Sequence, residues 1–157
     1  MSANKDLFDP HFWNEWEGED FTIIFPADWE VVEPFIPAMK FMALTSDDHD
    51  YGATLGVSVA NQVAGLSVDE QLEHYKKNMP IMISGLDNVN IEKKDDEHLD
   101  YYKATYTGII DDAQVQYEQY MWFVCDKLIT LTFTSTIDPP EEFRMIKEII
   151  FLAFKIK

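Results

Sequence analysis

The sequence predicts an α+β fold in which an antiparallel β-sheet of about six to eight strands is flanked by helices. Three observations support this prediction. The first half holds short β-rich runs, residues 101–136 hold long runs joined by tight turns, and two segments have helical periodicity. At 157 residues the chain has the size of one domain. We therefore expect one α+β domain over residues 21–157, preceded by an arm over residues 1–20.

The arm mixes aromatic and acidic side chains. Its rings are Phe12, Trp13 and Trp16, and acidic residues lie between and after them. Such a segment is either a strap whose rings cover an apolar patch of the domain or an exposed arm that acts as a ligand. The strap is favoured, because exposed tryptophans lower solubility.

The strands of the first half are short. Apolar and β-branched residues fill 21–25, and 29–33 combine Trp29, Val31 and Val32 with two glutamates. A proline follows each run and ends it. A third apolar run covers 40–44. Residues 54–60 alternate between small or polar and apolar side chains, which predicts a half-buried strand.

The first predicted helix starts at Ser67, which forms a capping box with Glu70. Pro80 is expected to stop or kink this helix. Apolar side chains recur along one face, at Val68, Leu72, Tyr75 and Met79. The helix should therefore bury this stripe against the sheet.

The second half predicts an antiparallel meander. Its strands are expected at 88–92, 101–110, 113–124 and 128–136, with Asp111 and Asp112 forming a compact hairpin turn. The last strand has the clearest alternation: apolar side chains at 129, 131 and 133 should point to one face and threonines to the other. One face should then pack on helices, while the other is wetter or covered by a less apolar layer.

A second helix is expected to close the chain. Asp138 is its predicted cap, with Pro139 at the first helical position. The predicted buried stripe comprises Phe143, Ile146, Ile150 and Ala153, with Ile149 beside it.

The charge of the chain limits its partners. The formal net charge is -17, so a polyanion such as nucleic acid or an anionic membrane surface would be repelled. A basic or apolar partner protein fits better, although the charge could simply keep the domain soluble. A long edge strand could also pair with its twin, which leaves a homodimer open.

Cys125 is the single cysteine, which excludes an intrachain disulfide and a cysteine-based zinc cluster. Since it ends an apolar strand pattern, we expect a buried structural thiol. No apolar run approaches the roughly 20 residues that span a bilayer. The first ten residues lack the apolar core of a signal peptide, so a cytoplasmic location is expected, although a trimmed exported form would leave no trace.

No catalytic or metal motif is complete. Residues 56–60 imitate the nucleophile turn of serine hydrolases, but the last glycine is absent and the segment lies within a predicted strand. Residues 47–50 are the best metal candidate, yet Val59 stands where a calcium loop starting at Asp48 needs glutamate. We expect no catalytic residues, no cofactor and no metal.

Aromatic residues crowd two adjacent predicted strands. Alternation places Tyr102 and Tyr106 on one face of their strand, and Tyr120 and Trp122 on one face of the next. Rings therefore occur on both faces of this hairpin. They could be core under two helices, or one face could be a binding surface. The candidate binding residues are Tyr102, Tyr106, Tyr120, Trp122, Trp13 and Trp16.

Four segments resemble one family in their order along the chain. They are the strand and Pro-x-x-Trp turn at 21–29, the helix start at 67–72, the meander at 101–136 and the closing helix with Phe151 and Phe154. In these segments the chain resembles the PsbP-like superfamily, which includes the DcrB-like proteins. Ala153 departs from the serine usual there. The resemblance implies an antiparallel sheet flanked by helices and no catalytic residues.

Members of that superfamily are mostly binding proteins, among them photosystem subunits, envelope lipoproteins and chaperones of type VI secretion effectors. The sequence thus predicts a non-enzymatic, protein-binding or chaperone-like module that holds an apolar or basic segment of a partner. The alternative is a small-ligand carrier or sensor with a pocket between sheet and helix. A third reading, an enzyme, would need a buried pair of titratable groups.

Overall fold

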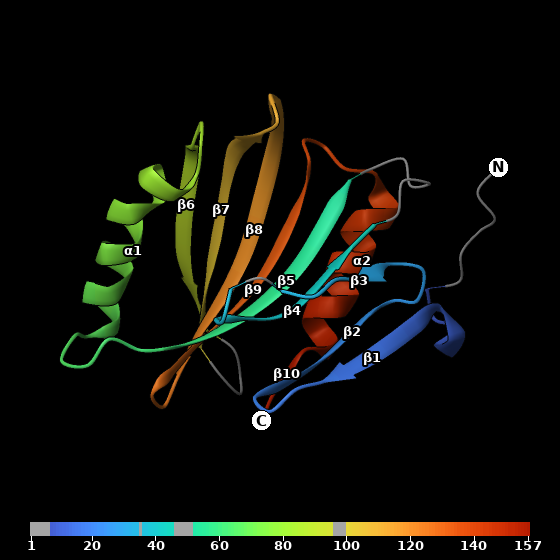
Figure 1. Ribbon diagram of the computed structural model, residues 1–157, viewed down its shortest axis with the longest axis horizontal. Coiled ribbons are helices and arrows are strands. Elements are labelled where there is room, and N and C mark those ends of the chain that lie inside the picture. The colour runs from blue at the N-terminus through green and yellow to red at the C-terminus, as the bar shows by residue number, and fades with distance from the viewer. Residues whose placement is uncertain (1–6, 35, 46–51, 96–99) are drawn as a thin grey trace.

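Two antiparallel sheets and two helices make up the computed structural model, which describes residues 7–34, 36–45, 52–95 and 100–157 (Figure 1). The large sheet has seven strands in the order β3-β4-β5-β9-β8-β7-β6, and the small sheet has the order β1-β2-β10. The prediction of an α+β fold with an antiparallel sheet flanked by helices is confirmed. The elements in chain order are η1 (Pro10–Phe12), β1 (Trp13–Glu17), β2 (Phe21–Pro26), β3 (Glu30–Val31), β4 (Met39–Leu44), β5 (Ala53–Asn61), α1 (Val68–Met82), β6 (Asp87–Lys94), β7 (Tyr101–Ile110), β8 (Ala113–Val124), β9 (Lys127–Thr136), α2 (Glu141–Ala153) and β10 (Lys155–Ile156).

The meander β7-β8-β9 is joined by two-residue loops. Ile110 pairs with Ala113 across the first loop, in which Asp111 and Asp112 both have positive φ (49° and 66°). This is the backbone of a type I′ turn, whose twist matches that of the flanking strands. The predicted Asp111-Asp112 turn is therefore present.

Cys125 lies in the second loop and corrects an expectation. Val124 pairs with Lys127, so the strand ends one residue before the cysteine. Cys125 has a φ of 54° and is exposed. The prediction of a buried thiol was wrong, because it extended the strand alternation into a residue that the tight loop turns outward.

Helix α1 begins as predicted. The amide of Glu70 donates to Ser67 Oγ at 3.1 Å, and the amide of Ser67 donates to Glu70 Oε1 at 3.2 Å, which completes the capping box. Pro80 does not stop the helix, which continues to Met82. Because Pro80 lies in the last turn of the helix, its missing amide removes only one hydrogen bond near the helix end. Leu72 and Met79 are buried, as the stripe predicted.

Helix α2 begins later than predicted. Its N-cap is Pro140, which makes no side-chain cap hydrogen bond, and Asp138 instead bends the chain with a φ of 50°. Pro139 precedes another proline, a position that disfavours helical dihedrals. Phe143, Ile146 and Ile150 are buried as expected, whereas Ala153 is half-buried. In the described part of the chain, no helix is long and apolar enough to cross a membrane.

The two helices cover opposite faces of the large sheet. Ile129, Leu131 and Phe133 of β9 point into the main core, which also holds the buried face of α2 and the small sheet. The threonines of β9 lie on the other face, as predicted. There α1 covers β6, β7 and β8 with a second, smaller core around Leu72 and Met79.

The N-terminal segment extends the small sheet. Strand β1 pairs antiparallel with β2, and β10 pairs with the other edge of β2. Trp13 Nε1 donates to the carbonyl of Leu7 at 2.7 Å. The ring of Trp16 lies 5.3 Å from that of Phe21 and 5.2 Å from that of Phe41. The rings of this segment thus lie against the main core.

Candidate functional site

Tyr120 and Trp122 lie beneath α2. Tyr120 is 7% and Trp122 6% exposed. The ring of Phe151 is 4.3 Å from that of Tyr120, and the ring of Phe154 is 5.2 Å from that of Trp122. Burial, together with the neighbouring Glu118 carboxylate, raises the pKa of Tyr120. In this structure, these two rings form part of the main core.

Tyr106 lies on the opposite face, beneath α1. It is 4% exposed and stacks on Tyr117 with centroids 4.7 Å apart. Its hydroxyl is hydrogen bonded to Tyr75 of α1, and the hydroxyl of Tyr75 in turn donates to Gln119. Burial raises the pKa of Tyr106, with a further contribution from Tyr75. These bonds satisfy the polar tips of rings whose bodies fill the second core.

Tyr102 shares the face of Tyr106 but lies near the start of α1, where the cover is open. It lines a pocket of about 360 Å³ together with Phe123, Lys93 and Asp100 and with the first residues of α1, Ser67, Val68 and Asp69. The rings of Tyr102 and Phe123 meet at 86° with centroids 5.8 Å apart. Tyr102 thus reaches an open cavity, and Tyr106 lines a smaller one of about 230 Å³.

The six candidate binding residues therefore do not form one surface. Tyr120 and Trp122 are under α2, Tyr106 is under α1, and Tyr102 is at the pocket. Trp13 and Trp16 lie on the small sheet. Alternation predicted the two faces correctly, but it carries no information on which helix covers each one.

A different surface exposes large apolar side chains. Ile81 and Met82 lie at the end of α1, and Ile109 and Ile110 lie at the end of β7. We call these four residues the apolar crest. These side chains are 83%, 73%, 43% and 46% exposed, respectively. Figure 1 shows the end of α1, the start of β6 and the tip of the β7-β8 hairpin at the same end of the molecule.

Backbone contacts join the two halves of the crest. The amide of Ile109 donates to the carbonyl of Ser84 at 2.8 Å. Gly85 lies so close to Ile109 that a Cβ built on the glycine would be 2.6 Å from Ile109 Cδ1. These contacts hold the turn that follows α1 against β7. They place Ile81 and Met82, which precede this turn, near the β7-β8 hairpin.

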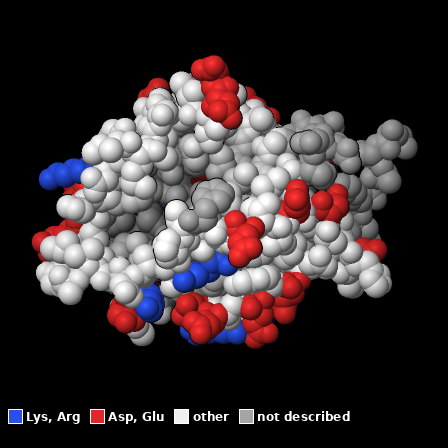
Figure 2. All heavy atoms as spheres, in the orientation of Figure 1, with Lys and Arg blue, Asp and Glu red and all other residues white. Residues whose placement is uncertain are grey.

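The surroundings of the crest are acidic. Asp87 begins β6 and is exposed, and Asp111 and Asp112 form the exposed hairpin tip. Neither 78–92 nor 104–126 contains a lysine or arginine. Figure 2 shows acidic side chains at the hairpin tip above a broad uncharged surface. Exposed apolar side chains and exposed aspartates thus occur at the same end of the molecule.

Sequence reasoning missed the crest, although a signal was present. Ile81-Met82 directly follows Pro80, and Ile109-Ile110 directly precedes Asp111. Two adjacent apolar residues point in different directions, so both are buried only where both sides are covered. A pair next to a turn is therefore a candidate for exposed apolar surface.

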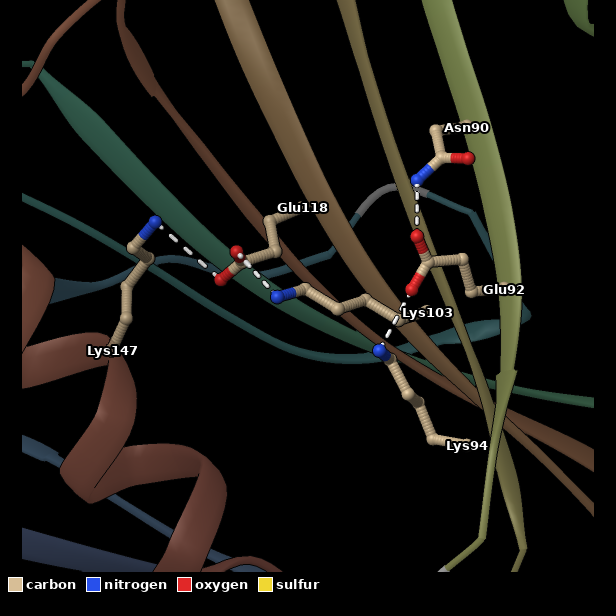
Figure 3. A network of polar contacts seen from close by, with 6 residues as sticks. All are labelled: Asn90, Glu92, Lys94, Lys103, Glu118 and Lys147. Carbon is tan, nitrogen blue, oxygen red and sulfur yellow. Dashed lines mark hydrogen bonds and ion pairs between the residues drawn. The ribbon is translucent and has the colours of Figure 1, made fainter.

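Lysines gather on the α2 side of the large sheet, where a polar network crosses β6, β7 and β8 (Figure 3). Lys103 and Lys147 approach the two oxygens of Glu118 at 3.5 Å and 3.4 Å, and Lys94 approaches Glu92 at 2.7 Å. Lys147 belongs to α2 and is 13% exposed at its side chain. Each ammonium group already faces a carboxylate, so this network ties α2 to the sheet.

The described residues give no support to a metal centre. No three His, Cys, Asp or Glu side chains gather in 7–34, 36–45, 52–95 and 100–157 so as to hold an ion. The metal candidate at 47–50 lies outside these ranges. Residues 56–60, the nucleophile-turn imitation, lie inside β5 rather than at a strand-to-helix turn.

Comparisons with known proteins identify the fold. No protein-family profile and no curated protein sequence matches this chain. A cyanobacterial PsbP (CyanoP) from Synechocystis superposes with a TM-score of 0.73 at 12% identity, over 99% of each chain.

Two further solved structures are similar. PA94 of Pseudomonas aeruginosa, a protein of unknown function, has a TM-score of 0.61 at 10% identity, covering 87% of this chain and 92% of its own. LpqN, involved in cell envelope biogenesis of Mycobacterium tuberculosis, has a TM-score of 0.60 at 9% identity, covering 92% and 90%. The chain therefore has the PsbP-like fold that the resemblance predicted.

Proposed function

We propose that the protein is a non-enzymatic binding module whose apolar crest docks on a partner protein through a segment that is both apolar and basic. The observation that carries this proposal is the exposure of four large apolar side chains at one end of the molecule, where exposed aspartates also lie. Contiguous exposed apolar patches with polar rims are characteristic of interaction sites. The PsbP-like fold agrees with a binding role, since the resemblance implies binding proteins.

The crest is preformed rather than loose. Ile109 is held by its backbone bond to Ser84 and by its contact with Gly85, and Ile110 is held by its pairing with Ala113. A preformed surface loses little conformational entropy when a partner binds. The unbranched Met82 side chain can adapt to the shape of an apolar segment, whereas the β-branched isoleucines are stiffer.

Charge selects the partner. Asp87, Asp111 and Asp112 lie at the same end of the molecule as the crest, in a chain of net charge -17. A segment that carries lysines or arginines beside its apolar residues would be attracted to these aspartates, whereas an acidic segment would be repelled. Electrostatic attraction of this kind accelerates association and weakens as salt is added.

The test compares a crest variant with an equally exposed control. Ile81→Ser/Met82→Ser removes half of the crest, and Leu152→Ser removes a side chain of α2 that is 74% exposed at another site. Tagged wild type and both variants would be used to capture proteins from native lysate at low salt. We expect wild type and Leu152→Ser to recover the same partner and the crest variant to lose it.

The recovered partner must also contain an apolar segment with lysines or arginines. Circular dichroism and urea unfolding check that the variants fold, which is expected because the substituted side chains are exposed. A partner that the crest variant retains, or that lacks such a segment, contradicts the proposal. An empty capture with wild type at low salt also counts against it.

A further inference from the structure

The pocket at the start of α1 carries a second, separate inference. It is formed by the rings of Tyr102 and Phe123, the side chains of Lys93 and Asp100, and the first residues of α1. The crest lies at the other end of the same helix, whose 15 residues span about 22 Å (Figure 1). The pocket is therefore a different place on the molecule.

Two rings form adjacent walls of this pocket. Tyr102 and Phe123 stand at 86° to each other, with centroids 5.8 Å apart, and both are half-buried. Ring faces carry negative electrostatic potential and attract cations that lie against them. The two rings lie edge to face and both line the pocket, which places aromatic surface where a cation can contact it.

The charged residues that line the pocket also favour a cation. Among the described residues that line the pocket, Asp69 and Asp100 are acidic and Lys93 is basic, so their summed formal charge is negative. An anion would meet two carboxylates. The capping box engages the amides of Ser67 and Glu70. Asp69 and Asp100 are both exposed to water, so a neutral ligand gains no attraction from them.

We propose that this pocket binds an alkylammonium group, either a free organic amine or a lysine side chain of a bound protein. The ammonium group lies against Tyr102 and Phe123 and is paired with Asp69 and Asp100, while the alkyl chain contacts the apolar ring surface. This inference does not rest on the function proposed for the crest. Each can fail without the other.

The charge of Lys93 allows binding of a cation to be distinguished from binding of an anion. It pairs in register with Tyr102 across β6 and β7, so its ammonium group shares the pocket with the ligand. Removing its charge should strengthen the binding of a cation and weaken the binding of an anion. Lys77 lies on α1 but outside this pocket, so Lys77→Gln is a matched control for the change in overall charge.

The experiment titrates the full-length, isotope-labelled protein with small probes and follows the backbone amides by NMR. The probes are n-butylammonium, its neutral analogue 1-butanol and the anion pentanoate, all of which carry a butyl chain, at the same ionic strength. We expect only n-butylammonium to shift the amides of 67–69, 93, 102 and 123. N-acetyl-lysine amide then distinguishes the sources: its binding supports a lysine side chain, and binding of the free amine alone supports a small amine.

Variants complete the test. Tyr102→Leu keeps an apolar side chain but removes the ring, and should weaken n-butylammonium binding by about threefold or more. Lys93→Gln should strengthen it, and Lys77→Gln should leave it nearly unchanged. Equal shifts with 1-butanol or pentanoate, no shift with either amine, or equal effects of the two lysine variants would overturn the proposal.

Discussion

Single residues decide how the strands of the meander turn. Asp111, Asp112 and Cys125 all have positive φ, a conformation that costs a side-chain-bearing residue roughly 1–2 kcal/mol relative to its relaxed state. Asparagine, aspartate and glycine are the usual residues there, and cysteine is not. Cys125 adopts this conformation in spite of its local preference, because the long strands on either side pair in full register.

Cys125→Gly should stabilise the protein by about 1 kcal/mol, because glycine adopts positive φ without strain. Urea unfolding would show a higher midpoint at unchanged slope. Cys125→Ala is the control: it also removes the exposed thiol but keeps a Cβ, so its midpoint should remain close to that of wild type. A lower midpoint for the glycine variant would mean that the loop is not strained.

At the level of elements, α1 is positioned at both ends by specific contacts. The capping box defines its start, and the close approach of Gly85 to Ile109 defines the turn that follows it. Gly85 also has a φ of 66°. This turn seats the helix end on β7 and thereby builds the apolar crest from segments about 27 positions apart in sequence.

Gly85→Ala should destabilise the protein by more than the backbone strain alone. The new methyl group would overlap Ile109, in addition to occupying a strained backbone position. Gly65→Ala is the matched control, since Gly65 has a φ of 84° but no atom within 4 Å of the added Cβ. We expect Gly85→Ala to lower the urea midpoint clearly further. Equal losses would show that Ile109 moves aside without cost.

At the level of the whole molecule, the large sheet connects two cores. Strands β7 and β8 contribute Tyr106 to the core under α1 and Tyr120 to the core under α2. The Glu118 network, with Lys147 from α2, lies on the same strands. Both cores are therefore built on the same two strands. Disruption of one core would expose strands that also support the other core.

This arrangement predicts a loss of stability in alkali. Burial raises the pKa of Tyr106 and of Tyr120 above the ordinary value of about 10. The folded state therefore holds these phenol protons more tightly than the unfolded state does. The resulting stabilisation is complete below about pH 10 and is lost as pH rises toward the folded pKa values.

Urea midpoints measured between about pH 8 and about pH 11 should fall in the upper part of this range. Phenolate absorbance should rise together with unfolding for these two residues. Tyr106→Phe and Tyr120→Phe should each make the alkaline fall shallower. A midpoint that stays constant across the range would contradict the burial of both hydroxyl groups.

Local patterns in the sequence determined much of this fold. The capping box at Ser67, the alternation of β9 and the turn at Asp111 depend on residues within a few positions of one another, and all three are present. The predicted start of α2 and the predicted burial of Cys125 were wrong. Two consecutive prolines delay the start of the helix, and a two-residue loop turns the cysteine outward.

Only the tertiary structure decided which surfaces are free. Tyr106 and Tyr120 carry the same kind of signal as Tyr102, yet α1 covers the first, α2 the second, and neither helix fully covers the third. The crest likewise depends on the contact between Ser84 and Ile109. Side-chain periodicity reports the direction of each residue, whereas burial depends on segments that are distant in sequence and meet only when the chain folds.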